Sequence, residues 1–141
     1  KFRGKPLADL YEEFTGECIF DTEEFVYGNL ICSGNERYIV GEVVEASEDY
    51  IILEWWTPVD PATVGQYTGL KDKNGVEIYE GDVLGGLLGD GVVVWVAAEA
   101  RFGISLGGEI HEVYFNELAQ NELEVVGNIW DDFGLLEEVE R

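Results

Sequence analysis

The chain has 141 residues, of which 46% are hydrophobic and 13% aromatic. This is enough apolar material for a folded interior, and the length fits one domain or two small lobes that share a core. The 8 lysine and arginine residues face 30 aspartate and glutamate residues, which gives a net charge of −22. Because phosphate contacts need clustered cations, this charge argues against binding to nucleic acids or anionic membranes. It favours a solvated surface and is compatible with a basic protein partner.

The first residues and the cysteines indicate a cellular compartment. Lys1-Phe2-Arg3-Gly4 lacks the apolar segment of a signal peptide, and no apolar run approaches the roughly 18 residues of a membrane span. Cys18 and Cys32 have neither zinc-site nor redox-motif spacing, and both have apolar neighbours, which predicts two buried free thiols. We therefore expect a cytoplasmic protein.

The segment 6–14 has the apolar spacing of a short helix. Its apolar residues recur at helical intervals, with a proline in the first turn and a glycine beyond the end: Leu7, Leu10, Tyr11 and Phe14. The predicted apolar stripe can pack on its own chain or against a neighbouring subunit, and packing on its own chain is the simpler expectation.

An antiparallel meander is predicted next. Its strands are expected at 24–32, 37–46 and 50–56, separated by turn residues. Asp60 and Pro61 then read as the cap and first residue of a single helical turn over 61–64. Residues 1–60 are accordingly predicted to form a lobe made of the N-terminal helix and the meander.

Residues 61–141 are predicted to form a small SH3-like β-barrel. Asn74-Gly75 suits a tight turn between strands, and Gly81-Asp82 makes a corner into the next strand. Further short strands, a helical turn and a C-terminal helix follow, at 82–88, 92–97, 102–106, 109–115, 116–120, 123–130 and 131–139. Short strands with glycine corners are typical of such barrels. The predicted fold class is mainly β, or β-rich α+β.

The same central stretch carries a family resemblance. The segments Val59 to Leu70, Lys71 to Gly75 and Ile78 to Asp82 together resemble the signature of the YopX family. Three further pieces agree with it: Lys1 to Gly4, Val26 to Leu30 and Val126 to Ile129. The resemblance implies a small, mostly β protein of phages and prophages, acting in a bacterial host. It implies no established activity and supplies no catalytic or binding residues.

No constellation in the sequence predicts catalysis, a cofactor or a metal. The one histidine, His111, lies beside carboxylates but has no nucleophile motif near it, so a surface histidine is the simpler interpretation. Asp72-x-Asn74-Gly75 lacks the glycine position and the twelfth-place glutamate of a calcium loop. The glycines of 81–91 lack the lysine of a phosphate-binding loop. We expect no enzyme.

Two adjacent tryptophans give the best hint of an interaction surface. In a strand, Trp55 and Trp56 face opposite ways, so one of them is expected at a second interface or, equally, in a core on the other face. Together with the predicted helical stripe they define the candidate interaction surface: Leu10, Tyr11, Phe14, Trp55 and Trp56.

These features predict a non-enzymatic accessory protein that acts through protein–protein contacts, as a homo-oligomer or an adaptor. One alternative is an acidic DNA mimic that inhibits a basic host protein, with its densest acidic cluster at Glu12, Glu13, Glu17, Asp21, Glu23 and Glu24. Another is a small-ligand binder or enzyme that uses a cleft between the lobes, near Asp60, Gln66, Tyr67 and Tyr79.

Overall fold

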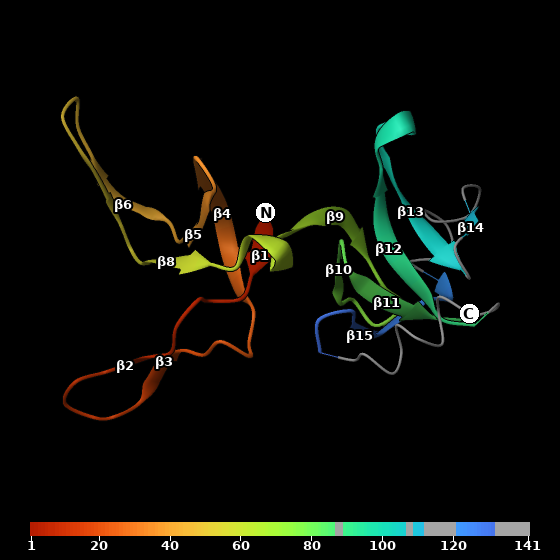
Figure 1. Cartoon of the computed structure of the whole chain (residues 1–141), viewed down its shortest axis with the longest axis horizontal. Coiled ribbons are helices and arrows are strands. Elements are labelled where there is room, and N and C mark those ends of the chain that lie inside the picture. The colour runs from red at the N-terminus through yellow and green to blue at the C-terminus, as the bar shows by residue number, and fades with distance from the viewer. Residues whose placement is uncertain (87–88, 107–108, 112–120, 132–141) are drawn as a thin grey trace. The chain divides into compact units, whose positions relative to one another are not determined.

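The computed structural model describes residues 1–86, 89–106, 109–111 and 121–131 (Figure 1). The chain forms two compact units, Lys1–Gln66 and Tyr67–Arg141, called here the N-terminal and C-terminal units. Strands dominate both units, which confirms the prediction of a mainly β protein. The boundary between the two predicted lobes, after residue 60, lies a few residues before the division between Gln66 and Tyr67.

The N-terminal unit is built on an antiparallel sheet. Its strands lie side by side in the order β1 (Phe2–Gly4), β4 (Val26–Ser33), β5 (Glu36–Val40) and β8 (Trp56–Val59). On the other edge of β1, Phe2 pairs with Gln66 at the start of β9 (Gly65–Lys71). At Gly28 a Cβ would lie 2.2 Å from the carbonyl oxygen of Val40, so β4 requires glycine to approach β5 this closely.

Two of the three predicted meander strands are each interrupted. The strand expected at 37–46 divides into β5 and β6 (Val43–Ala46), and the strand expected at 50–56 divides into β7 (Ile51–Leu53) and β8. Among the described strands, β6 and β7 pair only with each other, as a separate two-stranded hairpin. The Trp55 indole packs against Gly41 at the base of this hairpin, where a Cβ would lie 2.5 Å from Nε1.

The predicted helix over 6–14 is wrong. Pro6 bridges Val59, Leu7 N donates to Pro58 O at 3.1 Å, and β2 (Leu10–Tyr11) pairs with β3 (Cys18–Phe20). A helix this short has little stability of its own, because nucleation is costly. Pairing with β8 and β3 satisfies the same backbone groups, and the apolar stripe that favoured the helix remains exposed to solvent.

The single helical turn after the sheet is confirmed as the 3-10 helix η1 (Pro61–Thr63). The carboxylate of Asp60 accepts a hydrogen bond from Ala62 N at 3.0 Å and caps its first turn. β9 follows, and in the C-terminal unit its later residues pair with β10 (Glu77–Tyr79).

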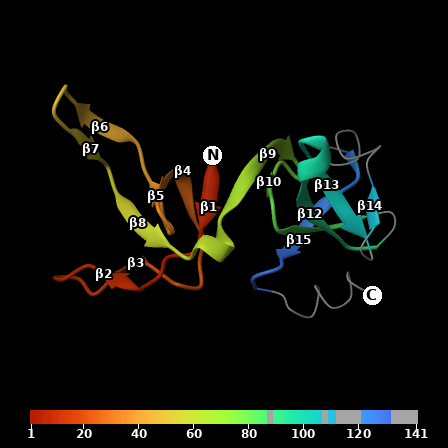
Figure 2. The ribbon, with the colours of Figure 1, turned by 45° about the horizontal axis from the view of Figure 1, so that its top comes forward.

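The C-terminal unit contains a curled antiparallel sheet (Figure 2). Its strand order is β14 (Glu109–His111), β13 (Arg101–Leu106), β12 (Gly91–Val96), β11 (Asp82–Gly85) and β15 (Glu124–Asn128). The sheet is consistent with the predicted strand succession, but its closure as an SH3-like barrel stays a prediction. The helical turn expected at 116–120 lies outside the described residues, and so do all but the first residue of the helix expected at 131–139.

Most of the described core belongs to the C-terminal unit. Its larger cluster consists of Ile78, Leu84, Val93, Ile104 and Leu123, with Leu70, Phe102, Leu106 and Val125 packed against it. A smaller cluster is formed by Val83 and Val92. These side chains come from β9 to β13, from Leu123 just before β15 and from β15 itself, so the central stretch of the sequence contributes to this core.

A buried carboxylate joins the central stretch to β15. Asp72 is 4% exposed, and its oxygens accept hydrogen bonds from the backbone N–H groups of Asn74, Val76 and Val125 at 2.8, 2.9 and 2.9 Å. Burial alone raises the pKa of Asp72, but the three N–H donors and the charge of Lys73 lower it, and their combined effect is the larger. The turn predicted at Asn74-Gly75 is thus held by a side chain that precedes it.

The corner predicted at Gly81-Asp82 is confirmed. Gly81 has φ of +91°, its N–H donates to Val93 O at 2.8 Å, and its carbonyl accepts from Ile129 N at 3.0 Å. The buried carboxylate of Asp82 accepts a hydrogen bond from Tyr79 N at 2.8 Å. Gly81 and Asp82 therefore both have a structural role, which is to hold this corner of the central stretch.

Candidate protein-interaction site

Two hairpins extend from the sheet of the N-terminal unit as separate arms (Figure 1, Figure 2). One is β2–β3 and the other is β6–β7. The structure describes every residue of this unit, so its exposed and buried side chains can be compared completely. Thirteen of its large apolar side chains are exposed, and three, Ile39, Val40 and Val59, are buried. More of its large apolar side chains are exposed than are fully buried, and exposed apolar patches mark interaction sites in soluble proteins.

The β2–β3 hairpin has an aromatic residue at its tip. Phe14 is 92% exposed, and Leu10, Tyr11 and Ile19 are exposed along the strands. The Glu12 carboxylate accepts hydrogen bonds from Phe14 N at 2.7 Å and Thr15 N at 2.8 Å, which shapes the turn beneath the ring. These bonds lower the pKa of Glu12. Phe14 is thus held out from the sheet by an ordered turn.

The β6–β7 hairpin exposes apolar side chains along both of its strands. Val43 pairs with Leu53 and Ala46 with Ile51, with an irregular register between them. Its exposed apolar residues are Val43, Val44, Tyr50, Ile51 and Ile52. A lone two-stranded hairpin is at best marginally stable in water, and its outer edges can pair with another strand.

The two adjacent tryptophans lie at the junction between β7 and β8. Trp56 is 58% exposed and meets Tyr38 edge-on, with ring centroids 5.9 Å apart. Trp55 is half-buried and packs against Phe20 at 5.8 Å. The predicted surface residues Leu10, Tyr11 and Phe14 lie on the β2–β3 arm, so all five belong to the N-terminal unit.

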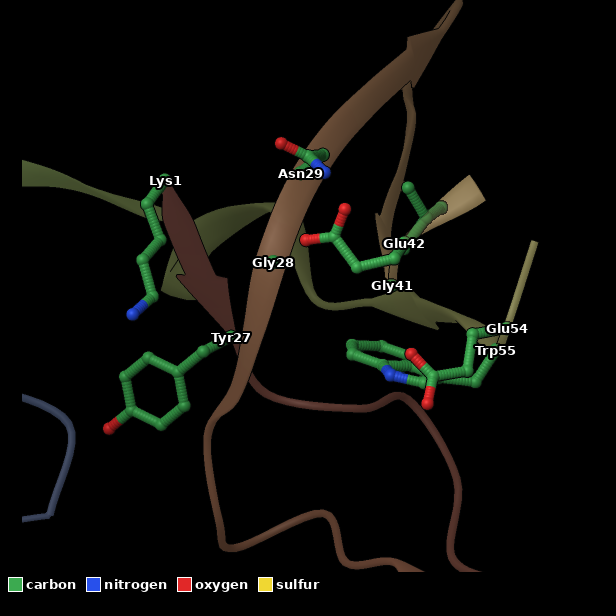
Figure 3. A pocket seen from close by; sticks show the side chains of 9 residues that line it. Lys1, Tyr27, Gly28, Asn29, Gly41, Glu42, Glu54 and Trp55 are labelled. Atoms are coloured by element: carbon green, nitrogen blue, oxygen red, sulfur yellow. The ribbon is translucent and has the colours of Figure 1, made fainter. Parts of the chain in front are cut away.

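Next to Trp55 lies a pocket of about 370 Å³ within the N-terminal unit (Figure 3). It is lined by Lys1, Tyr27, Gly28, Asn29, Val40, Gly41, Glu42, Glu54 and Trp55. The backbone pairs Gly41 with Trp55 and Glu42 with Glu54 at the base of the β6–β7 hairpin, through N–H···O bonds of 2.9 and 2.8 Å. Two carboxylates and an indole therefore share one wall of the pocket.

The densest acidic segment coincides with the β2–β3 arm. Some of its carboxylates have local partners: Asp21 accepts a hydrogen bond from Glu23 N, and Asp9, just upstream, accepts one from Thr22 N, both at 2.8 Å. Exposed apolar side chains interrupt the charges along the arm. A DNA mimic requires regularly spaced carboxylates, so this alternative stays a prediction without added support.

Cys18 and Cys32 are free, as predicted, but the prediction that they are buried is wrong. Cys18 lies in β3 of the exposed β2–β3 arm and Cys32 near the end of β4, where apolar neighbours in the sequence are themselves exposed. Partial desolvation raises the pKa of the Cys18 thiol, and the nearby carboxylates of Asp21 and Asp9 raise it further.

The four residues of the predicted cleft are divided between the two units. Asp60 caps η1 and Gln66 is exposed on β9, both in the N-terminal unit. Tyr67 and Tyr79 are brought together in the C-terminal unit, where their rings lie 5.5 Å apart across β9 and β10. A ligand site formed by all four stays a prediction.

The described residues show no convergent catalytic or metal-binding group. Among them, no three His, Cys, Asp or Glu side chains gather where they can hold a metal ion. The backbone of His111 pairs with Ile104 in the sheet, but its side chain lies outside the described part of the structure. Within that part, no helix combines the length and the apolar character of a membrane span.

Sequence reasoning predicted the turn at Ser47-Glu48-Asp49, but it missed that the strands on either side break and that β6 and β7 form a separate arm, because continuous strands were expected there. Its signal was present: paired apolar runs, Val43-Val44 and Ile51-Ile52, flank the Ser47-Glu48-Asp49 turn and match a hairpin. Neither strand pairs with a third strand in the part of the chain that the structure describes, and apolar residues of the arm are left exposed.

Comparison with known proteins agrees with the resemblance noted in the sequence. A search of the curated proteins gives no match. The family model described as YopX protein matches residues 19–137, which is most of the chain. The matched segment includes the β6–β7 arm, the capped turn at Asp60, the Asp72 turn and the Gly81 corner. The chain therefore belongs to the YopX family.

Proposed function

We propose that this YopX-family chain is a non-enzymatic accessory protein of a phage or prophage, which acts in the host cytoplasm through protein–protein contacts. The N-terminal unit assembles with further copies of the chain through its β2–β3 and β6–β7 arms. The observation that carries this proposal is the imbalance in that unit between thirteen exposed and three buried large apolar side chains.

The β6–β7 arm favours a second copy as the occupant. Among the described residues its strands have no third neighbour, and a lone hairpin is only marginally stable, so a partner that is always at hand fits it best. Another copy of the chain meets this condition, since antiparallel strand edges are self-complementary about a two-fold axis. Burying a side chain such as Ile51 in such an interface stabilises it by about 1.5–3 kcal/mol.

The test is solution mass by light scattering, with one substitution in each arm and one outside both. Phe14→Ser and Ile51→Ser remove apolar surface from the β2–β3 and β6–β7 arms. Val76→Ser is the control, because Val76 is an exposed apolar residue that lies outside both arms, in the C-terminal unit. It is 48% exposed, the same exposed fraction as Leu10 in the β2–β3 arm. Circular dichroism verifies that each variant remains folded.

We expect the wild-type chain and Val76→Ser to have the same mass, a multiple of the 15.8 kDa monomer. Either arm variant should shift the mass toward the monomer at the same concentration. A wild-type chain that stays monomeric up to high micromolar concentration overturns the proposal. Equal effects of all three substitutions would also contradict it, because the arms would then have no special role.

A further inference from the structure

We propose that the pocket beside Trp55 binds the cationic side chain, preferably an arginine, of a basic protein partner. This site is separate from the copy-to-copy contact, because neither Phe14 nor Ile51 lines the pocket. The partner is a protein segment rather than a nucleic acid, since the overall charge of −22 repels phosphates.

The first argument is the placement of two carboxylates. Glu42 and Glu54 are cross-strand neighbours, because Glu54 N donates to Glu42 O at 2.8 Å, and both line the pocket. Like charges directly opposite each other destabilise a strand pair, so a cation placed between them and the pocket relieves this repulsion. Figure 3 shows both carboxylates on the Trp55 side of the pocket.

The second argument is the indole of Trp55, which lines the same pocket as the two carboxylates. Trp55 lines the pocket and is fixed in place by Gly41 on one side and Phe20 nearby, with ring centroids 5.8 Å apart from Phe20. The face of an indole attracts a guanidinium or ammonium group, and a planar guanidinium can stack on the ring while its N–H groups reach a carboxylate. An indole with two flanking carboxylates matches an arginine side chain better than a neutral group.

Other parts of the lining come from β4 and from the first residue of the chain. Tyr27 and Asn29 lie on β4, and Figure 3 shows the Tyr27 ring directed away from Trp55 and the two carboxylates. The one cation among the lining residues is Lys1, and Figure 3 shows its ammonium group beside Tyr27, on the other side of β4 from the carboxylates. Gly28 and Gly41 line the pocket through their backbone, since the space a Cβ would take is filled by Val40 O at Gly28 and by the Trp55 indole at Gly41.

The test uses the full chain and two short peptides, acetyl-Gly-Arg-Gly-amide and its citrulline counterpart, which keeps the shape of arginine but not its charge. Binding is followed by the NMR shift of the Trp55 indole N–H, assigned with Trp55→Phe. We expect a saturable shift with the arginine peptide and an affinity about tenfold lower with citrulline, because two partly exposed ion pairs and one cation–π contact are lost.

A matched pair of variants separates the pocket from the general negative field. E42Q/E54Q removes two charges that line the pocket, and E45Q/E48Q removes two charges from the same hairpin that do not line it. The first pair should weaken arginine binding about tenfold and the second about twofold or less.

Equal affinities for the two peptides would overturn the proposal, and so would equal effects of the two variant pairs. Absence of any shift at the Trp55 indole would overturn it as well. These outcomes are independent of the solution mass of the chain, so they are distinguishable from a failure of the proposed assembly.

Discussion

Gly41 packs so closely against the Trp55 indole that a Cβ at residue 41 would lie 2.5 Å from the indole Nε1. The backbone joins the same two residues, because Gly41 N donates to Trp55 O at 2.9 Å. This contact lies where β5 gives way to β6 and where β7 gives way to β8. It therefore places both the β6–β7 arm and the wall of the pocket.

Gly41→Ala should destabilise the N-terminal unit because the added methyl group overlaps the indole. Overpacking of this kind costs about 1–3 kcal/mol in the free energy of unfolding, measurable by chemical denaturation. The control is a double-mutant cycle with Trp55→Ala. In that background the cost of Gly41→Ala should largely disappear, and an unchanged cost would show that the two residues are not coupled.

Asp72→Asn should destabilise the C-terminal unit by about 2–3 kcal/mol. The amide keeps one acceptor oxygen where the carboxylate accepts three backbone N–H bonds, and bonds to a charged acceptor are the stronger ones. Denaturation of the variant measures the effect. Asp60→Asn is the control, because asparagine caps a helical turn as well as aspartate does, and its change should stay within about 0.5 kcal/mol.

The same carboxylate predicts a pH dependence of stability. The pKa of Asp72 in the folded protein lies below its usual value of 3.8, so the ionised group stabilises the fold above that value. This contribution should be lost as the pH falls through the lowered folded-state pKa. Chemical denaturation at pH values from about 5 to about 2 should show a smaller loss in the free energy of unfolding for Asp72→Asn than for wild type. Parallel curves would contradict the role of Asp72.

Cys18 should react slowly with an alkylating reagent at mildly alkaline pH, although it is exposed. Desolvation and the carboxylates of Asp21 and Asp9 raise its pKa, which reduces the fraction of reactive thiolate. Asp21→Asn should increase the alkylation rate, followed by mass spectrometry of the Cys18 peptide. The rate at Cys32 serves as the internal control and should not change; a change at both sites would indicate a general opening of the unit.

The sequence predicted the parts of the fold that depend on local chemistry. The Asp60 cap and the Gly81 corner follow from the conformational preferences of those residues, and the mainly β class follows from strand patterning. The prediction of a helix over 6–14 was wrong because a helix this short has little stability of its own, and residues 10–11 pair with β3 instead. Spacing alone does not show whether an apolar stripe has a core to cover.

The candidate site was only partly predictable, for a related reason. Trp55 and Trp56 were identified by their adjacency, but the pocket depends on Glu42 and Gly41, which reach Trp55 only through the hairpin pairing. The role of Asp72 depends on Val125, far away in the sequence. Contacts between distant segments are set by tertiary packing, which no local pattern encodes.

The most direct test of assembly through the N-terminal unit is the solution mass of the unmodified chain across a salt series. Each copy has a net charge of −22, so salt that screens the mutual repulsion should strengthen apolar association. We predict an oligomer whose mass is maintained or increases as the salt concentration rises from low to about 1 M, where screening acts within a few ångströms. A chain that is monomeric at every salt concentration would contradict the account.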